Sequence, residues 1–409
     1  MPILVRLAWR NIWRNRRRTW LTLAAIAFGA GLLVFNIGLQ MGSYAMTIDN
    51  TVRIFYGHLQ VQRAGYLDAP KMRTAVARVR ELADRIGRVP GVAAAAPRAY
   101  GFALASSATR SYGIQVVGVA PRREPGVSNI PGLVRRGRYL SGDHAMEAVV
   151  GRRLARNLHL DVGGELTLLG TGRDGSVAAV AVPVAGIFET GSAEVDRGFV
   201  EIPLGTFQEV FSMDGAGHAV VVRGRGVAEL GNLERRVRAA LPPGEDLVVL
   251  TWDRLLPGMK ELIDLDFASS WFFYAALVVV ITFSIMNTFL MSVLERTREF
   301  GLLLALGMRP RRIGAMVLLE ALVLTLLGLC LGECLGVAVN AWFYVHGFSI
   351  PGMEELAAHF NMPSAIRPRF TPFTLGSGPA AVFAAAMLSA LYPALRARRL
   401  RPLEALKAA

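Results

Sequence analysis

Two stretches without any charged residue constrain the fold of this chain more than any other feature. Residues 19–48 carry no charge over 30 positions, and residues 267–294 carry none over 28 positions. About 20 consecutive apolar residues are enough for an α-helix to cross the hydrocarbon core of a bilayer. Each stretch therefore predicts a transmembrane helix.

Two further apolar stretches lie nearer the C-terminus. Residues 313–345 contain only Glu320 and Glu333 as charges, and residues 371–395 contain three prolines but no charge. Hydrophobic residues make up 53% of the chain, and the mean hydropathy of +0.39 lies outside the usual range of soluble proteins. We therefore predict a membrane protein with four transmembrane α-helices, at residues 19–48, 267–294, 313–345 and 375–395.

The basic side chains predict how these helices are oriented. Residues 1–18 hold six basic residues and no acid, residues 295–312 hold five against two acids, and residues 396–409 hold five against one. Segments rich in arginine and lysine stay in the cytoplasm. These segments, an amphipathic basic helix, a loop and a tail, are predicted to be cytoplasmic, as are both termini. Only three of the 45 basic residues are lysines, a bias that genome composition can produce, so no nucleic-acid partner is predicted.

The segment 45–266 is predicted to lie outside the membrane, as is the shorter loop 346–374. Its 222 residues are enough for a separate core. Residues 57–62 and 165–170 alternate as strands do, while residues 72–89 repeat apolar residues at helical spacing. This mixture predicts an α+β domain inserted between helices 1 and 2. The sequence GTGRDGS at 170–176 predicts a hairpin turn in which Gly172 and Gly175 can supply positive φ.

The sequence beside both membrane crossings of this domain stays compatible with a helix. Residues 41–47 continue the first apolar run, and residues 254–271 lead into the second. The transmembrane helices are therefore predicted to extend outward as stalks. Pro257 and Gly258 predict either a kink or a helix cap in the second of them.

No pattern in the sequence predicts catalysis or metal binding. His144, which follows Asp143, and Glu147 have an H-x-x-E spacing that could place two metal ligands on one helical face. A metal site needs at least a third ligand, so a solvated turn is the favoured interpretation. Cys330 and Cys334 lie four apart in an apolar run, which favours packing of small residues over redox chemistry. A phosphate-binding GxxxxGK[ST] loop is absent from the sequence. Any use of ATP therefore requires another subunit.

The loop 295–312 combines charged ends with an apolar centre. It is long enough for one helix, on which Phe300, Leu303, Leu304 and Gly307 share a face, while Leu302 and Leu306 fall elsewhere. Such a helix could rest in the membrane interface or bind a protein partner. The residues that we predict for docking an ATPase are Glu295, Arg296, Glu299, Phe300, Gly301, Leu303, Leu304, Ala305, Leu306 and Gly307.

Glycines spaced four apart predict close helix packing inside the membrane. Gly328, Gly332 and Gly336 form two overlapping GxxxG units, and Gly38 and Gly42 form another. Such units let two helices approach closely. Packing within one chain and contact with a second chain both remain open.

Two carboxylates lie within the third predicted span. An ionisable residue in a membrane is a candidate functional group. Counted from Ile313 at about 1.5 Å per residue, Glu333 lies near the far interface and can be solvated, whereas Glu320 lies deeper. We predict that Glu320 pairs with an arginine such as Arg16 or Arg17.

Several segments together resemble a known family. They are RLAWRNIWRNRRRTWLTLAAIAFG (6–29), VVGRRLARNLHLDVGGELTL (149–168) with GIFETGSAEVDRGFVEI (186–202), ERTREFG followed by ALG (295–307), and YPALRARRLRPLEALKAA (392–409). They resemble the N-terminal helix, periplasmic domain, cytoplasmic loop and C-terminal tail of permeases in the MacB, LolC/LolE and FtsX superfamily of ABC transporters. The LolC/LolE-like permeases fit best, because MacB carries a fused ATPase domain and FtsX has a smaller outer domain.

The resemblance implies a complex in the bacterial inner membrane. Two four-span permeases, identical or related, would stand on two ABC ATPase subunits, which would bind ATP and Mg²⁺, while this chain would bind no cofactor. The loop helix would dock on the ATPase and transmit its movement outward, by mechanotransmission. Lipoproteins or other amphipathic molecules would be the cargo. A periplasmic carrier is a further candidate partner, although the hairpin at 170–176 lacks the proline of the carrier-binding hook in LolC.

Other functions fit the same residues. One is an FtsX-like transmitter that controls an external hydrolase or complex, and another is a MacB-like efflux permease. A membrane-anchored scaffold without any ATPase is a third.

Overall fold

The chain folds into two compact units. The computed structural model describes residues 2–352, 354, 357 and 363–399. A helical unit contains the chain up to Tyr44, residues Leu262–Ile350 and the chain from Ala365 on, and an α+β unit contains Ala45–Glu261 and Pro351–Ser364. The tail predicted at 396–409 lies outside the described residues beyond Arg399.

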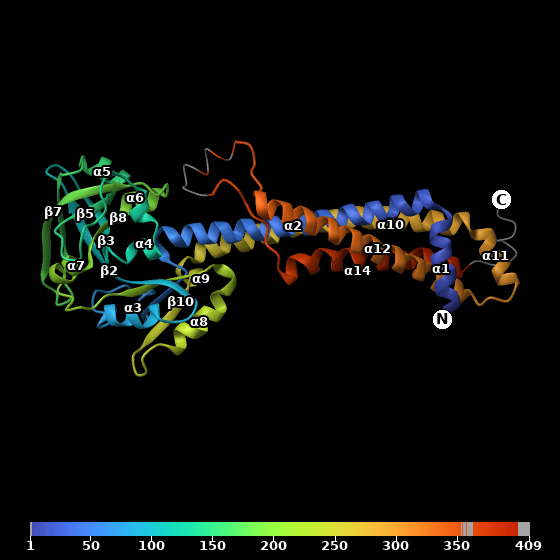
Figure 1. The fold of residues 1–409 in the computed structure, drawn as a ribbon, viewed down its shortest axis with the longest axis horizontal. Helices are drawn as coiled ribbons and strands as arrows, with labels where there is room; N and C mark the ends of the chain where they lie inside the picture. The colour runs from blue at the N-terminus through green and yellow to red at the C-terminus, as the bar shows by residue number, and fades with distance from the viewer. Residues whose placement is uncertain (1, 353, 355–356, 358–362, 400–409) are drawn as a thin grey trace. The chain divides into compact units, whose positions relative to one another are not determined.

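Four long helices build the helical unit, as predicted (Figure 1). Each is long and apolar enough to cross a membrane. Pro257, Pro310 and Pro372 begin three of them, because proline fits the first turn of a helix, where no N–H is needed. Pro257 thus starts a helix and does not kink one. The helices that contribute to this unit are α1 (Pro2–Arg14), α2 (Arg16–Thr51), α10 (Pro257–Glu295), α11 (Thr297–Ala305), α12 (Pro310–His346) and α14 (Pro372–Arg398), and α2 and α10 each run a few residues past its bounds.

A shared apolar core holds the long helices together. Ile26 and Leu33 of α2 pack in one cluster with Phe289 of α10, Leu324 of α12 and Val382 of α14. All five side chains are less than one-tenth exposed. Cys330 and Cys334 lie on the exposed surface of α12, so the small-residue packing predicted for them is not seen within this chain.

The α+β unit consists of one ten-stranded sheet and short helices. Its strands are β1 (Leu59–Arg63), β2 (Val92–Ser106), β3 (Ser111–Val119), β4 (Val134–Gly137), β5 (Ala148–Gly151), β6 (Glu165–Thr171), β7 (Val177–Phe188), β8 (Phe199–Pro203), β9 (Ala219–Gly224) and β10 (Leu247–Thr251). Its helical segments are η1 (Val52–Tyr56), α3 (Val79–Gly87), α4 (Glu124–Val127), η2 (Ile130–Leu133), α5 (Arg152–Leu158), α6 (Ala193–Gly198), α7 (Leu204–Val210), η3 (Val227–Glu229), α8 (Leu230–Ala239) and α9 (Trp252–Leu255).

The strand pairings close part of this sheet into a ring. β6 pairs with both β2 and β7, which joins the two ends of the series β2, β3, β8, β5 and β7. Closure removes free strand edges, which otherwise template association with other chains. β9, β1 and β10 extend the sheet beyond β2. The predicted α+β class is confirmed, and so is the hairpin, because β6 and β7 pair antiparallel around a turn in which Gly175 has a φ of +90°.

A buried ion cluster lies inside the α+β unit. The fully buried guanidinium of Arg98 on β2 binds the buried carboxylate of Glu124 on α4 and stacks 4.5 Å from the ring centre of Phe55. Glu201 on β8 is also fully buried and accepts a 2.8 Å hydrogen bond from the Tyr139 hydroxyl. Burial raises the pKa of Glu201 to about 8, and the charge of Glu124 adds to the rise. Glu201 is therefore protonated in the folded chain at neutral pH.

This proton makes the stability of the chain depend on pH. Between the ordinary pKa of 4.5 and about 8, the folded chain keeps the Glu201 proton while the unfolded chain releases it. Stability therefore falls as pH rises through that window. We expect Glu201→Gln to raise the unfolding temperature at pH 9 and to change it little at pH 5, measured on the full chain in detergent. An equal effect at both pH values would contradict this assignment.

Candidate functional site

The loop between α10 and α12 forms the short helix α11. α10 ends at Glu295, Arg296 precedes the first residue of α11, and Pro310 begins α12. Gly307 follows α11 with a φ of +92°, a conformation that residues with a Cβ rarely adopt. The chain can therefore reverse direction within a few residues, so α11 is held close to the ends of both neighbouring helices.

A buried ion pair connects this loop to α12. Nη1 of Arg296 lies 3.0 and 2.9 Å from the two carboxylate oxygens of Glu320. The side chains of both residues are about one-tenth exposed. The amide of Asn11 on α1 donates a 2.8 Å hydrogen bond to Oε1 of Glu320, and the Arg296 guanidinium lies 5.1 Å from the centre of the Phe300 ring. One carboxylate thus joins α1, the start of α11 and α12.

Two more ion pairs connect the N-terminal helices to the same loop. Arg14 of α1 contacts both oxygens of Glu299, at 2.7 and 3.0 Å. Arg18 of α2 contacts Glu295 at 2.6 Å and donates a hydrogen bond to Ser292. Burial of Glu299 alone would raise its pKa, but the hydrogen bonds and charges of Arg14 and Arg296 together outweigh this and lower the pKa. Charged contacts from α1 and α2 therefore reach α11 and the end of α10 that precedes it.

The apolar face predicted for a partner packs instead on the chain itself. Phe300 is 1% exposed and lies among Ile313 and Val317 of α12 and Ala394 of α14. Leu303 and Leu304 pack half-buried against the same cluster. The prediction that Phe300, Leu303 and Leu304 face outward is therefore corrected. A helical repeat shows which residues share a face but not which face the rest of the chain covers.

The opposite side of α11 is exposed. Leu302 is 55% exposed and Leu306 is 77% exposed, and Ala305 between them is exposed as well. The sequence analysis left Leu302 out of the predicted docking residues but included Ala305 and Leu306 among them. These three residues, called the outer α11 face below, are the apolar surface that the structure leaves free. Glu295, Glu299 and Gly307 are exposed beside it, while Arg296 and Gly301 are buried.

The two carboxylates inside α12 have different environments. Glu320 pairs with Arg296 and Asn11, so the prediction of Arg16 or Arg17 as its partner is wrong. The partner comes from the loop, 24 residues before it in the sequence. Glu333 is half-exposed and forms no ion pair with any of the described residues.

The predicted glycine contacts lie within this chain. A Cβ added to Gly328, Gly332 or Gly336 of α12 would lie 2.6–2.8 Å from atoms of α2, which is closer than real Cβ contacts allow. A Cβ at Gly38 would lie 2.6 Å from the amide of Asn340. At Gly42 it would meet the backbone of Arg367 and Pro368. These glycines let α2 approach α12 and the segment before α14, which is the first of the two predicted roles.

Other side chains considered from the sequence serve structural contacts. Asp143 pairs with Arg80 at 2.8 Å, His144 with Glu209 at 2.7 Å, and Glu147 with Arg138 at 2.6 Å. Among the described residues, no group of three or more His, Cys, Asp or Glu is placed to hold a metal.

The sequence analysis missed two N-terminal arginines that bind the loop and Asn11, which binds Glu320 of α12. Arg14 and Arg18 are four residues apart, as are their partners Glu295 and Glu299. The available signal was the same four-residue spacing of opposite charges in two segments of the sequence, although many arginines of this sequence could have supplied it.

Two family models match the sequence. The MacB-like periplasmic core domain matches residues 19–240, and the FtsX-like permease C-terminal model matches residues 271–402. The chain is 22% identical to the lipoprotein-releasing system transmembrane protein LolC of Neisseria meningitidis, over 95% of this chain and 94% of that protein. It is 26% identical to the macrolide export ATP-binding/permease protein MacB of Nitrosomonas europaea, over 82% of this chain but only 51% of that protein.

A crystal structure of the periplasmic region of MacB from Actinobacillus actinomycetemcomitans aligns with 53% of this chain and 98% of that one, with 12% identity and a TM-score of 0.38. Family membership follows from the sequence models, the first of which matches more than half of the chain. Together with the four apolar helices, these matches show that the chain is a multi-pass membrane protein of the MacB, LolC and FtsX family of ABC-type permeases.

Proposed function

We propose that this chain is the membrane-spanning subunit of an ATP-driven transporter and that a separate ATPase subunit docks on the outer α11 face. The observation that supports this proposal is that one side of α11 packs on α12 and α14 through Phe300, while its other side is exposed and apolar. Burying Leu302 and Leu306 in a cleft would contribute about 1.5–3 kcal/mol each before ordering costs. That is enough to make these two leucines central to a docking surface.

The charge distribution supports a cytoplasmic position for α11. Residues 1–18 and 295–312, which contain α1 and α11, hold eleven basic residues and two acids. Such segments remain on the cytoplasmic side of the bacterial inner membrane, where ATP is available. In this proposal both termini are cytoplasmic, and ATP and Mg²⁺ bind to the partner subunit.

The ion pairs of the loop can transmit a displacement of α11 to the neighbouring helices. A push on α11 reaches α12 through Arg296 and Glu320, and reaches α1 and α2 through Arg14 and Arg18. Two ATPase subunits that close on ATP would move two permeases, identical or related, and the long helices would carry that movement to the opposite side. Work would then be done on cargo outside the membrane, by mechanotransmission.

A lipoprotein or another amphipathic molecule is the proposed cargo. The relative named for lipoprotein release aligns with this chain along nearly the full length of both proteins. Macrolide export is the second candidate, because the MacB-like periplasmic core model matches residues 19–240.

Reconstitution tests the proposal. The chain, purified from its native membrane with any bound ATPase, is placed in proteoliposomes with a fluorescent triacylated lipoprotein. We expect an ATPase subunit to copurify and ATP to release the lipoprotein, whereas ADP does not. Transport of a macrolide without lipoprotein release would favour the MacB-like activity. Absence of any copurifying ATPase would contradict the proposal.

A further inference from the structure

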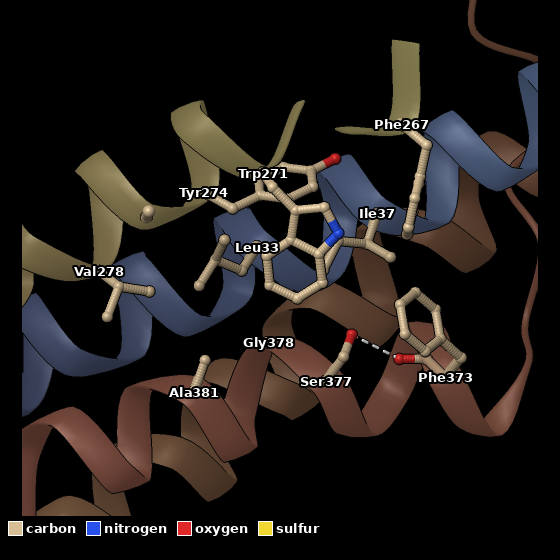
Figure 2. A pocket seen from close by; sticks show the side chains of 11 residues that line it. Leu33, Ile37, Phe267, Trp271, Tyr274, Val278, Phe373, Ser377, Gly378 and Ala381 are labelled. Carbon is tan, nitrogen blue, oxygen red and sulfur yellow. Dashed lines mark hydrogen bonds between the residues drawn. The ribbon is translucent and has the colours of Figure 1, made fainter. Parts of the chain in front are cut away.

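An apolar pocket of about 240 Å³ lies between α2, α10 and α14. Figure 2 shows Leu33 of α2, Trp271 of α10 and Ala381 of α14 around it. All of its lining belongs to the helical unit. Trp271 is 47% exposed and Phe373 is 44% exposed, so the pocket opens on the outer surface of the helices.

The pocket has almost no free polar group to which a water molecule could hydrogen-bond. Its lining includes two hydroxyl groups, and both already have partners: Tyr274 donates to Oε1 of Gln40 at 2.6 Å, and Ser377 donates to the carbonyl of Phe373 at 2.7 Å. A buried water needs two to four polar partners, and apolar cavities stay dry. The medium around transmembrane helices is hydrocarbon, so a hydrocarbon occupant is favoured.

The size of the pocket limits that occupant. Sites for drug-sized molecules usually measure about 300–1,000 Å³. A cavity of about 240 Å³ is smaller and fits a segment of one flexible chain. The occupant that fits this volume is therefore a single acyl chain.

A polar network beside the pocket marks where its apolar wall ends. The Tyr44 hydroxyl donates to Asp266 at 2.5 Å, and the amide of Gln40 donates to Ser270 at 2.5 Å, next to Tyr274 in the pocket wall. The indole N–H of Trp271 has no hydrogen-bond partner among the described residues. Tryptophan near the end of a transmembrane helix commonly lies at the membrane interface, where its N–H reaches polar lipid groups.

We propose that this pocket binds one acyl chain of a membrane phospholipid, whose glycerol ester lies at the indole N–H of Trp271. This site goes beyond the proposed function, because it describes a resident lipid between the helices that the ATPase would move. A bound chain would fill the gap between α10 and α14 and restrain their separation.

Native mass spectrometry of the full chain tests the proposal. The chain is released from nanodiscs of one defined phospholipid, and retained lipids are counted. Ala381→Phe fills the pocket, while Ala384→Phe changes an exposed residue of the same helix that does not line it. We expect one retained lipid whose occupancy falls at least about tenfold in Ala381→Phe, because several methylene groups lose their burial. Ala384→Phe should retain it.

A second pair of variants protects the test against misfolding. Ala275→Phe enters the pocket from α10, and exposed Ala276→Phe is its control. Equal lipid retention by pocket and control variants would overturn the proposal. So would retention of only an acylated peptide, or a lipid-free dimer that covers the pocket.

Discussion

Replacing Leu302 and Leu306 together with glutamate should reduce permease-stimulated ATP hydrolysis to the rate of the isolated ATPase subunit. These side chains are 55% and 77% exposed, so the change acts on a surface and not on the core. Loss of two buried leucines removes at least about 3 kcal/mol of docking energy, which weakens binding about 100-fold or more. The measurement is ATP turnover in proteoliposomes as the ATPase subunit is titrated.

A matched pair elsewhere controls for the added charge. Leu169 and Val177 lie on the two strands of the β6–β7 hairpin and are 46% and 77% exposed. Leu169→Glu with Val177→Glu should leave stimulated turnover unchanged. If the α11 variant keeps full stimulation at limiting ATPase concentration, the outer α11 face is not the docking surface. The thermal unfolding of the Leu302→Glu, Leu306→Glu variant should match that of the unaltered chain.

Removing the Glu320 carboxylate should cost about 3–5 kcal/mol of stability, because Glu320→Ala leaves the buried Arg296 charge without its partner. The expected result is a large fall in the unfolding temperature of the chain in detergent. Glu333→Ala is the matched control on the same helix. Since Glu333 is half-exposed and has no ion pair among the described residues, its loss should change stability by about 0.5 kcal/mol or less.

A double variant separates stability from coupling. Arg296→Met with Glu320→Met replaces the pair by apolar side chains and should recover most of the lost stability. It should still couple poorly, because the Arg296–Glu320 pair no longer ties the loop to α12 by charge. If Glu333→Ala proves as destabilising as Glu320→Ala, or if the double variant transports normally, the ion pair does not have the assigned role.

The long helices were predictable because their evidence is local. A charge-free run of 28 or 30 residues allows few structures other than a transmembrane helix, and the prolines mark where three helices begin. The β6–β7 hairpin was predictable for the same reason, since its turn lies within seven residues. The closure of the sheet was not, because the β2–β6 pairing joins residues more than 60 positions apart.

The candidate site was predicted in its location but not in its orientation. The periodicity of 295–312 predicts a helix, yet the choice of covered face depends on Ile313, Val317 and Ala394, which belong to other helices. The partner of Glu320 could not be found from depth alone, because several arginines lie at that end of the helices. Arg98, Glu124 and Glu201 come together only when the sheet forms, although a lone charge within an apolar strand was a usable signal for Arg98 and Glu201.

Photo-crosslinking in the native membrane tests the central claim most directly. A benzoylphenylalanine placed at position 306, on the outer α11 face, should form a crosslink to an ATPase subunit, and one at position 177 should not. Identification of the captured protein by mass spectrometry gives the answer. A crosslink from position 306 only to lipid or to this chain itself would contradict the account.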